Sequence, residues 1–160
     1  MKFAGKVKFS PAREVSRAHL EKSEGIPSEE RQLQLVRFAQ NAEVLKEQLP
    51  EDFKNYDSRN FNKIHHEGNF STQLLHIARF PNERTMVVFG LVTNISNRTR
   101  RPTPLFLEVG GVRRYALPSQ HLVQDSLKPG EEHRCIMILT GEGDERPAHL
   151  SLENDFKLVF

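Results

Sequence analysis

The chain has 160 residues, of which 37% are hydrophobic and 28% are charged, an ordinary balance for a folded globular protein. Its formal net charge of +2 is too small to indicate nucleic acid as a partner by bulk charge alone. No run approaches the roughly 18 apolar residues of a transmembrane helix, so we expect no membrane partner. The first residues lack the apolar core of a signal peptide, and we therefore expect a cytoplasmic protein, or a virion component assembled in a cytoplasm.

Residues 1–60 have the pattern of a helical and extended N-terminal arm. Ser10 and Pro11 are typical of an N-cap followed by a proline, which predicts a first helix from there to about Ser23. Ser28 predicts the start of a second helix that ends near Pro50. Its apolar residues form one stripe, which the C-terminal domain, the first helix or another subunit must cover. The stripe consists of Leu35, Phe38, Ala39, Ala42, Leu45 and Leu49.

Residues 50–68 follow neither a helical nor a strand period and are mostly polar. Three aromatic residues, Phe53, Tyr56 and Phe61, are spaced through this stretch. A linker without a partner has little use for three rings. We therefore expect an irregular segment that runs along a surface and attaches to it through these side chains.

Residues 61–160 place glycines and prolines between short runs of β-branched and aromatic residues, which is typical of an all-β region. The run from Thr85 to Ile95 is apolar on both parities, which predicts a central strand covered on both faces. Gly110 and Gly111 predict a hairpin, because a type I′ turn needs positive φ at both central residues. We predict strands over 70–80, 85–95, 105–109, 112–116 and 133–139, a short one near 122–126, and apolar alternation at 150–152 and 156–160.

This spacing of strands and turns indicates an antiparallel sandwich or barrel and not a parallel sheet. We predict a mainly β fold, with a sandwich of seven or eight strands over 61–160 preceded by the arm over 1–60. The single cysteine, Cys135, excludes an internal disulfide. It shares a strand face with Met137 and Leu139, so we predict a small buried hydrophobe there and not a reactive thiol.

Residues 85–140 combine an apolar strand, an asparagine-rich turn at 92–97, a strand pair and the turn Leu127-Lys-Pro-Gly-Glu131 before another apolar strand. In this turn proline fixes φ at the first corner and glycine takes positive φ at the second. In this order of elements the segment resembles small bacterial immunoglobulin-like accessory domains. The resemblance implies an immunoglobulin-like sandwich with binding or scaffolding duties. The Cys–Trp–Cys core of antibody domains is absent, and residues 1–60 have no counterpart in the resemblance.

Residues with catalytic or metal-binding spacing are not apparent in the sequence. It contains no nucleophile elbow, phosphate loop or dinucleotide fingerprint. His65 and His66, followed by Glu67, are the most metal-like feature. Adjacent residues of an extended chain point in opposite directions, so the pair is poorly placed to hold one ion. We therefore expect no enzyme activity, no cofactor and no metal.

Charge is unevenly distributed along the chain. Residues 79–114 contain seven arginines and two acids, whereas residues 125–157 contain eight acids and four basic residues. Arginine side chains suit phosphate and carboxylate partners equally, while the alternative is a solvated loop that keeps the protein soluble. The candidate basic surface consists of Arg98, Arg100, Arg101, Arg113 and Arg114.

Together these patterns favour a non-enzymatic structural or assembly protein, most readily a capsid-decorating or connector component of a virion. In this hypothesis the arm and the charged sandwich surface dock onto protein subunits, other copies of the chain included. The partner-binding residues would be the arginines above with Leu35, Phe38, Leu45, Phe53, Tyr56 and Phe61. One alternative is a nucleic-acid-binding module that uses the arginines, with a steep salt dependence. Another is an adaptor or inhibitor that binds one host protein.

Overall fold

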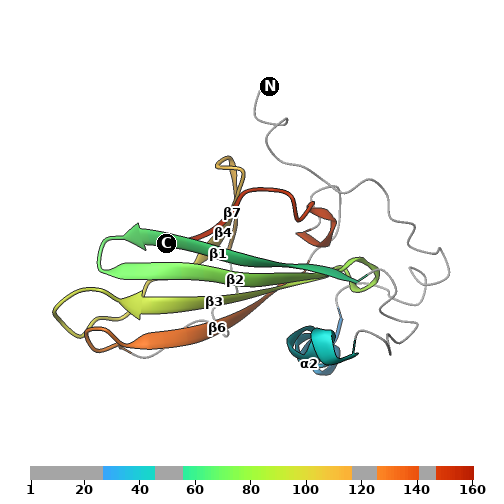
Figure 1. The fold of residues 1–160 in the computed structure, drawn as a ribbon, viewed down its shortest axis with the longest axis horizontal. Coiled ribbons are helices and arrows are strands. Elements are labelled where there is room, and N and C mark those ends of the chain that lie inside the picture. Colours follow the sequence, from blue (N-terminus) through green and yellow to red (C-terminus); the bar gives the residue numbers. More distant parts are fainter. Residues whose placement is uncertain (1–26, 46–55, 117–125, 141–146) are drawn as a thin grey trace.

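The computed structural model describes residues 27–45, 56–116, 126–140 and 147–160, without the side chains of 42–45 and 113–114. Seven strands in these ranges form two antiparallel sheets, which confirms the predicted mainly β fold. One sheet has the order β1-β2-β3-β6 and the other β5-β4-β7, in a sandwich-like arrangement (Figure 1). The strands are β1 (Asp57–Glu67), β2 (Phe70–Phe80), β3 (Thr85–Asn94), β4 (Phe106–Val109), β5 (Arg113–Ala116), β6 (Glu132–Thr140) and β7 (Phe156–Val159). The helices are α2 (Glu29–Leu45) and the 3-10 turns η3 (Pro81–Glu83) and η5 (Pro147–His149).

The main core lies between the two sheets. Cys135, Met137 and Leu139 of β6 all contribute to it, and Cys135 is buried, as the strand alternation predicts. At Gly90 the sheets come so close that an added Cβ would lie 2.4 Å from Cδ1 of Leu158 on β7. The other buried members include Leu74, Ile77, Met86, Val88, Val92, Leu107, Val109, Leu150 and Phe156.

Helix α2 covers part of the outer face of the four-stranded sheet (Figure 1). Ser28 caps it, since its Oγ accepts a hydrogen bond from the backbone N–H of Arg31 at 3.2 Å. Leu35 and Phe38 are 0% and 6% exposed. They pack with Ala39 and Val36 against Ala78, Phe80, Val87 and Ile138.

The chain's own sheet therefore covers the described part of the apolar stripe, which is Leu35, Phe38 and Ala39. In this packing neither Leu35 nor Phe38 is accessible to a neighbouring subunit, and their assignment as partner-binding residues stays a prediction. The same packing confirms that β3 is a central strand covered on both faces: Val88 belongs to the inner core and Val87 to the cluster under α2. The end predicted near Pro50 and the helix predicted over 10–23 lie outside the described residues.

Strand β1 corrects the prediction of an irregular segment over 50–68. Two features hide it from sequence patterning: it is a polar edge strand, and its register with β2 shifts between Asn60 and Lys63. Two of the three aromatic side chains expected to attach this segment to a surface pack within the chain itself. The ring of Tyr56 packs edge-on against that of Phe38, with centroids 5.0 Å apart, and the ring of Phe61 against that of Phe156, with centroids 5.7 Å apart. β1 begins at Asp57, ahead of residue 61, and the division into arm and sandwich domain stays a prediction.

The remaining predictions differ in small ways from the structure. Gly110 and Gly111 have φ of 61° and 70°, as a type I′ turn requires, but Val109 pairs with Arg113, so the hairpin loop has three residues. Residues 151–155 form a turn and not a strand. The strand predicted near 122–126 lies almost wholly outside the described residues. No helix in the described ranges is long and apolar enough to cross a membrane.

Candidate anion-binding groove

Asn94, the last residue of β3, organises the loop that carries three of the predicted arginines. It is fully buried, and its Nδ2 donates hydrogen bonds to the carbonyl oxygens of Arg98 at 2.8 Å and Leu127 at 2.7 Å. Its Oδ1 accepts hydrogen bonds from the backbone N–H and the hydroxyl of Ser96, at 2.9 Å and 2.6 Å. One side chain thus satisfies two carbonyls and fixes the path of the loop.

The backbone of the loop is held again at Arg100. Its N–H donates to the carbonyl of Leu127 at 3.0 Å, and the N–H of Leu127 donates back to the carbonyl of Arg100 at 2.8 Å. Pro102 and Pro104 follow at once and restrict φ at their own positions. The arginine side chains therefore extend from a loop whose backbone is already held in place without a ligand.

A groove of about 520 Å³ lies between this loop, the β1–β2 turn and Phe160. Its volume falls in the range of roughly 300–1,000 Å³ that small ligand sites occupy. The rings of Phe70 and Phe160 lie 5.6 Å apart. Glu67 is anchored, because one of its carboxylate oxygens accepts a hydrogen bond from the N–H of Phe160 at 2.8 Å. The lining consists of Glu67, Asn69, Phe70, Thr99, Arg100, Arg101, Thr103 and Phe160.

The arginines at this groove carry charge that the described part of the chain does not neutralise. Within that part, no acid forms an ion pair with Arg98, Arg100 or Arg101, and their guanidinium groups make no hydrogen bond. Arg98 and Arg101 are exposed, whereas Arg100 is half-buried and its Nε is buried without an acceptor. A buried donor without an acceptor costs free energy.

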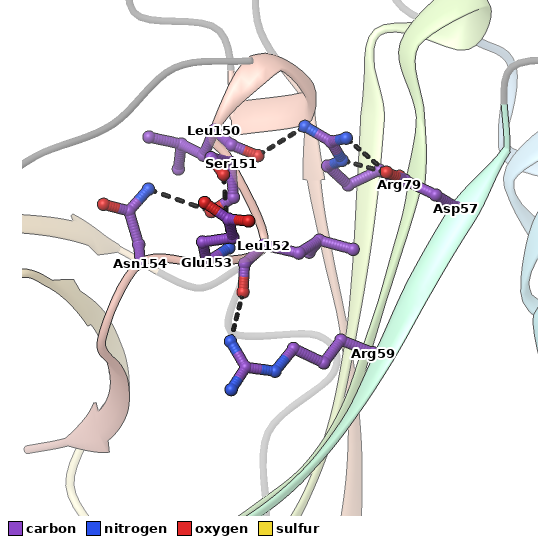
Figure 2. A network of polar contacts seen from close by, with 8 residues as sticks. All are labelled: Asp57, Arg59, Arg79, Leu150, Ser151, Leu152, Glu153 and Asn154. Atoms are coloured by element: carbon purple, nitrogen blue, oxygen red, sulfur yellow. Dashed lines mark hydrogen bonds and ion pairs between the residues drawn. The ribbon is translucent and has the colours of Figure 1, made fainter.

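Other arginines of the chain are used for internal structure. Arg79 is 2% exposed and donates to both carboxylate oxygens of Asp57, with Nε 2.6 Å from Oδ1. Its Nη1 lies 2.6 Å from the carbonyl oxygen of Leu150, which joins β1 and β2 to the segment before β7 (Figure 2). Arg59 donates to the carbonyl of Leu152 at 2.6 Å, also in Figure 2, and its guanidinium lies 4.8 Å above the ring of Phe61.

The structure divides the predicted arginine surface. Arg100 and Arg101 line the groove, whereas Arg98 lies on the same loop outside its lining. Arg113 and Arg114 belong to β5, at the edge of the other sheet, and Arg114 is opposite Glu108 in the ladder. The side chains of Arg113, Arg114 and Leu45, and all of Phe53, lie outside the described residues.

Sequence reasoning did not assign Glu67 and Asn69 to the same site as the arginines, nor Asn94 to the support of the loop. The asparagine-rich turn at 92–97 is the sequence signal that could have pointed to the role of Asn94. The link between Glu67 and Phe160 spans 93 residues and leaves no local pattern.

The histidine pair does not form a metal centre with its surroundings in the described ranges. No group of three or more His, Cys, Asp or Glu residues there could hold an ion. The Nε2 of His65 lies 3.9 Å from Oε1 of Glu67, while His66 pairs with Ser71 in the β1–β2 ladder.

Comparison with known proteins gives no family. No family model matches the sequence, and no curated protein matches it either. The chain is similar to the crystal structure of a conserved hypothetical protein from Bacillus anthracis, with 15% sequence identity and a TM-score of 0.45. The match covers 65% of this chain and 90% of that one.

Proposed function

We propose that the protein is a non-enzymatic docking module that holds an acidic segment of a protein partner in the groove beside residues 95–104. The observation that carries the proposal is that Arg100 and Arg101 line a groove without an ion-pair partner in the described part of the chain. A guanidinium can bind a carboxylate through two parallel hydrogen bonds, which gives orientation as well as affinity.

The support of the loop strengthens this proposal. The hydrogen bonds of Asn94 and the paired backbones of Arg100 and Leu127 hold the loop in the absence of ligand. A site that is already ordered loses less conformational entropy when a partner binds. Binding to this groove would therefore require little rearrangement of the backbone.

Nucleic acid is the alternative ligand for the same arginines, and it fits the groove less well. Phe70 is only 7% exposed and packs against Phe160, so its ring offers little face for stacking a base.

The proposal also covers the kind of complex in which the docking module acts. We propose that the partner belongs to a larger assembly such as a virion, with an adaptor role toward a single protein as the alternative. An immunoglobulin-like topology of the two sheets is likewise a proposal. The packing of α2 on its own sheet removes one argument for an arm that embraces a neighbour. It leaves the basic groove as the docking feature that the described residues support.

The test is binding of a fluorescein-labelled oligoglutamate peptide, measured by fluorescence anisotropy on the full chain at low and moderate salt. The double variant R100E/R101E should weaken binding by at least about tenfold, because it replaces attraction with repulsion at the groove. R98E/R134E is the matched control: it makes the same charge change at two exposed arginines outside the groove lining, and should cost less than about threefold.

Equal losses in R98E/R134E and R100E/R101E would show that only the overall charge of the protein matters, and would refute the groove as the site. The same titrations with labelled oligothymidylate examine the alternative. Tighter binding to oligothymidylate than to oligoglutamate, with a steep salt dependence, would favour the nucleic-acid module instead.

A further inference from the structure

Glu67 adds a negative charge to a groove that is otherwise basic. It ends β1 and precedes Gly68, whose φ of 60° turns the chain toward β2. The hydrogen bond from the N–H of Phe160 fixes one of its oxygens, and the side chain is 42% exposed. The Nε2 of His65 lies 3.9 Å from the other oxygen.

Glu67 and the arginines share the groove without pairing to each other. Both kinds of residue line it, yet no ion pair joins Glu67 to Arg100 or Arg101 in the described part of the chain. The groove thus holds separated charges of both signs. A purely acidic ligand would satisfy the arginines and be repelled by Glu67, whereas a ligand with both signs could satisfy both.

We infer that the groove recognises a mixed-charge peptide segment, in which a carboxylate binds Arg100 and Arg101 and a neighbouring lysine or arginine binds Glu67. The inference rests on the proposed function and specifies the partner's chemistry. Glu67 is then a specificity-determining residue: it favours a neighbouring cation and disfavours groups with two negative charges, such as phosphate.

Three labelled peptides of equal length test the inference on the full chain: alternating Glu and Gln, alternating Glu and Lys, and the first peptide with its central Glu replaced by phosphoserine. The wild-type protein should bind the Glu/Lys peptide about threefold more tightly than the Glu/Gln peptide, the gain of one partly exposed ion pair. In E67Q that preference should vanish, and the phosphoserine peptide should gain more affinity than the Glu/Gln peptide. Glutamine can still accept the hydrogen bond from Phe160, so the variant retains the anchor.

E132Q is the matched control, because Glu132 is exposed at the start of β6 and does not line the groove. It should leave the order of the three peptides unchanged. A Glu/Lys preference that is absent in the wild-type protein, or that persists in E67Q, would overturn the inference. Glu/Gln binding that still depends on Arg100 and Arg101 would in that case leave the proposed function intact, whereas binding insensitive to both arginines would refute the proposed function itself.

Discussion

The two ends of the four-stranded sheet use arginine in opposite ways. At the end where β1 begins and β2 finishes, Arg79 is buried and bonded to Asp57 and to the carbonyl of Leu150. Arg31 of α2 joins the same end by an ion pair with Glu83. At the other end, Arg100 and Arg101 line a groove and form no ion pair with any acid among the described residues.

The difference separates arginines that the fold uses from arginines that it does not use. At the first end the guanidinium groups complete hydrogen bonds that the fold itself requires. At the groove end the backbone is satisfied by Asn94 and by the pairing of Arg100 with Leu127, so the fold does not need the arginine side chains. Charges that the fold leaves unused remain free to act on a ligand.

The largest effect should come from breaking the buried pair. Arg79→Ala leaves the Asp57 carboxylate and the carbonyl of Leu150 without their donor, and should lower the free energy of unfolding by about 3 kcal/mol. The measurement is urea denaturation followed by circular dichroism. Arg59→Ala, which removes one exposed arginine from the same network, should cost less than about 1 kcal/mol. Equal costs for both variants would contradict the structural role of Arg79.

The next largest effect tests whether α2 packs on the outer face of its own sheet. Leu35→Ala deletes a fully buried side chain and should cost about 2 kcal/mol, near the lower limit for such a change because the helix can move inward. Leu33→Ala, on the same helix with 53% of its side chain exposed, should change stability by less than about 0.5 kcal/mol. A Leu35→Ala variant as stable as Leu33→Ala would indicate that α2 does not pack on its own sheet in solution.

A smaller effect should appear at the groove end when the support of the loop is removed. Asn94→Ala deprives the carbonyls of Arg98 and Leu127 of a donor, and should lower stability by about 1.5 kcal/mol. The same variant should also weaken oligoglutamate binding, since the arginines then extend from a less ordered loop. Asn97→Ala, at an exposed position of the same loop, is the control and should change neither quantity. Loss of stability without any loss of binding would argue against a preorganised site.

The smallest effect on stability should come from the groove arginines themselves. The double variant R100E/R101E should shift the free energy of unfolding by less than about 0.5 kcal/mol, because the described residues offer these side chains no ion pair to lose. The same denaturation experiment reports it. A cost comparable to that of Arg79→Ala would show that the two arginines are structural and that the contrast between the two ends is wrong.

Local patterns determined much of the secondary structure. Glycine and proline punctuation and apolar runs place β2, β3, β6 and the β4–β5 hairpin close to their observed bounds. The stripe of α2 and its cap at Ser28 follow from helical spacing and hydrogen-bonding chemistry. Strand β1 escaped prediction, because an edge strand with few buried residues and a register shift carries no alternating apolar signal.

The tertiary structure alone decided what each charged or apolar residue does. The sequence marked Arg98, Arg100 and Arg101 as one cluster, but only the path of the chain past Glu67 and Phe160 separates the groove-lining pair from Arg98. It marked the stripe of α2 as needing a cover, but only the packing on Phe80 and Val87 identifies the chain itself as that cover. Helix capping, turn formation and hydrophobic periodicity depend on residues close together in the chain, so the sequence alone reveals them. Pairing and burial join residues far apart in the chain, so they are fixed only when the two sheets pack together.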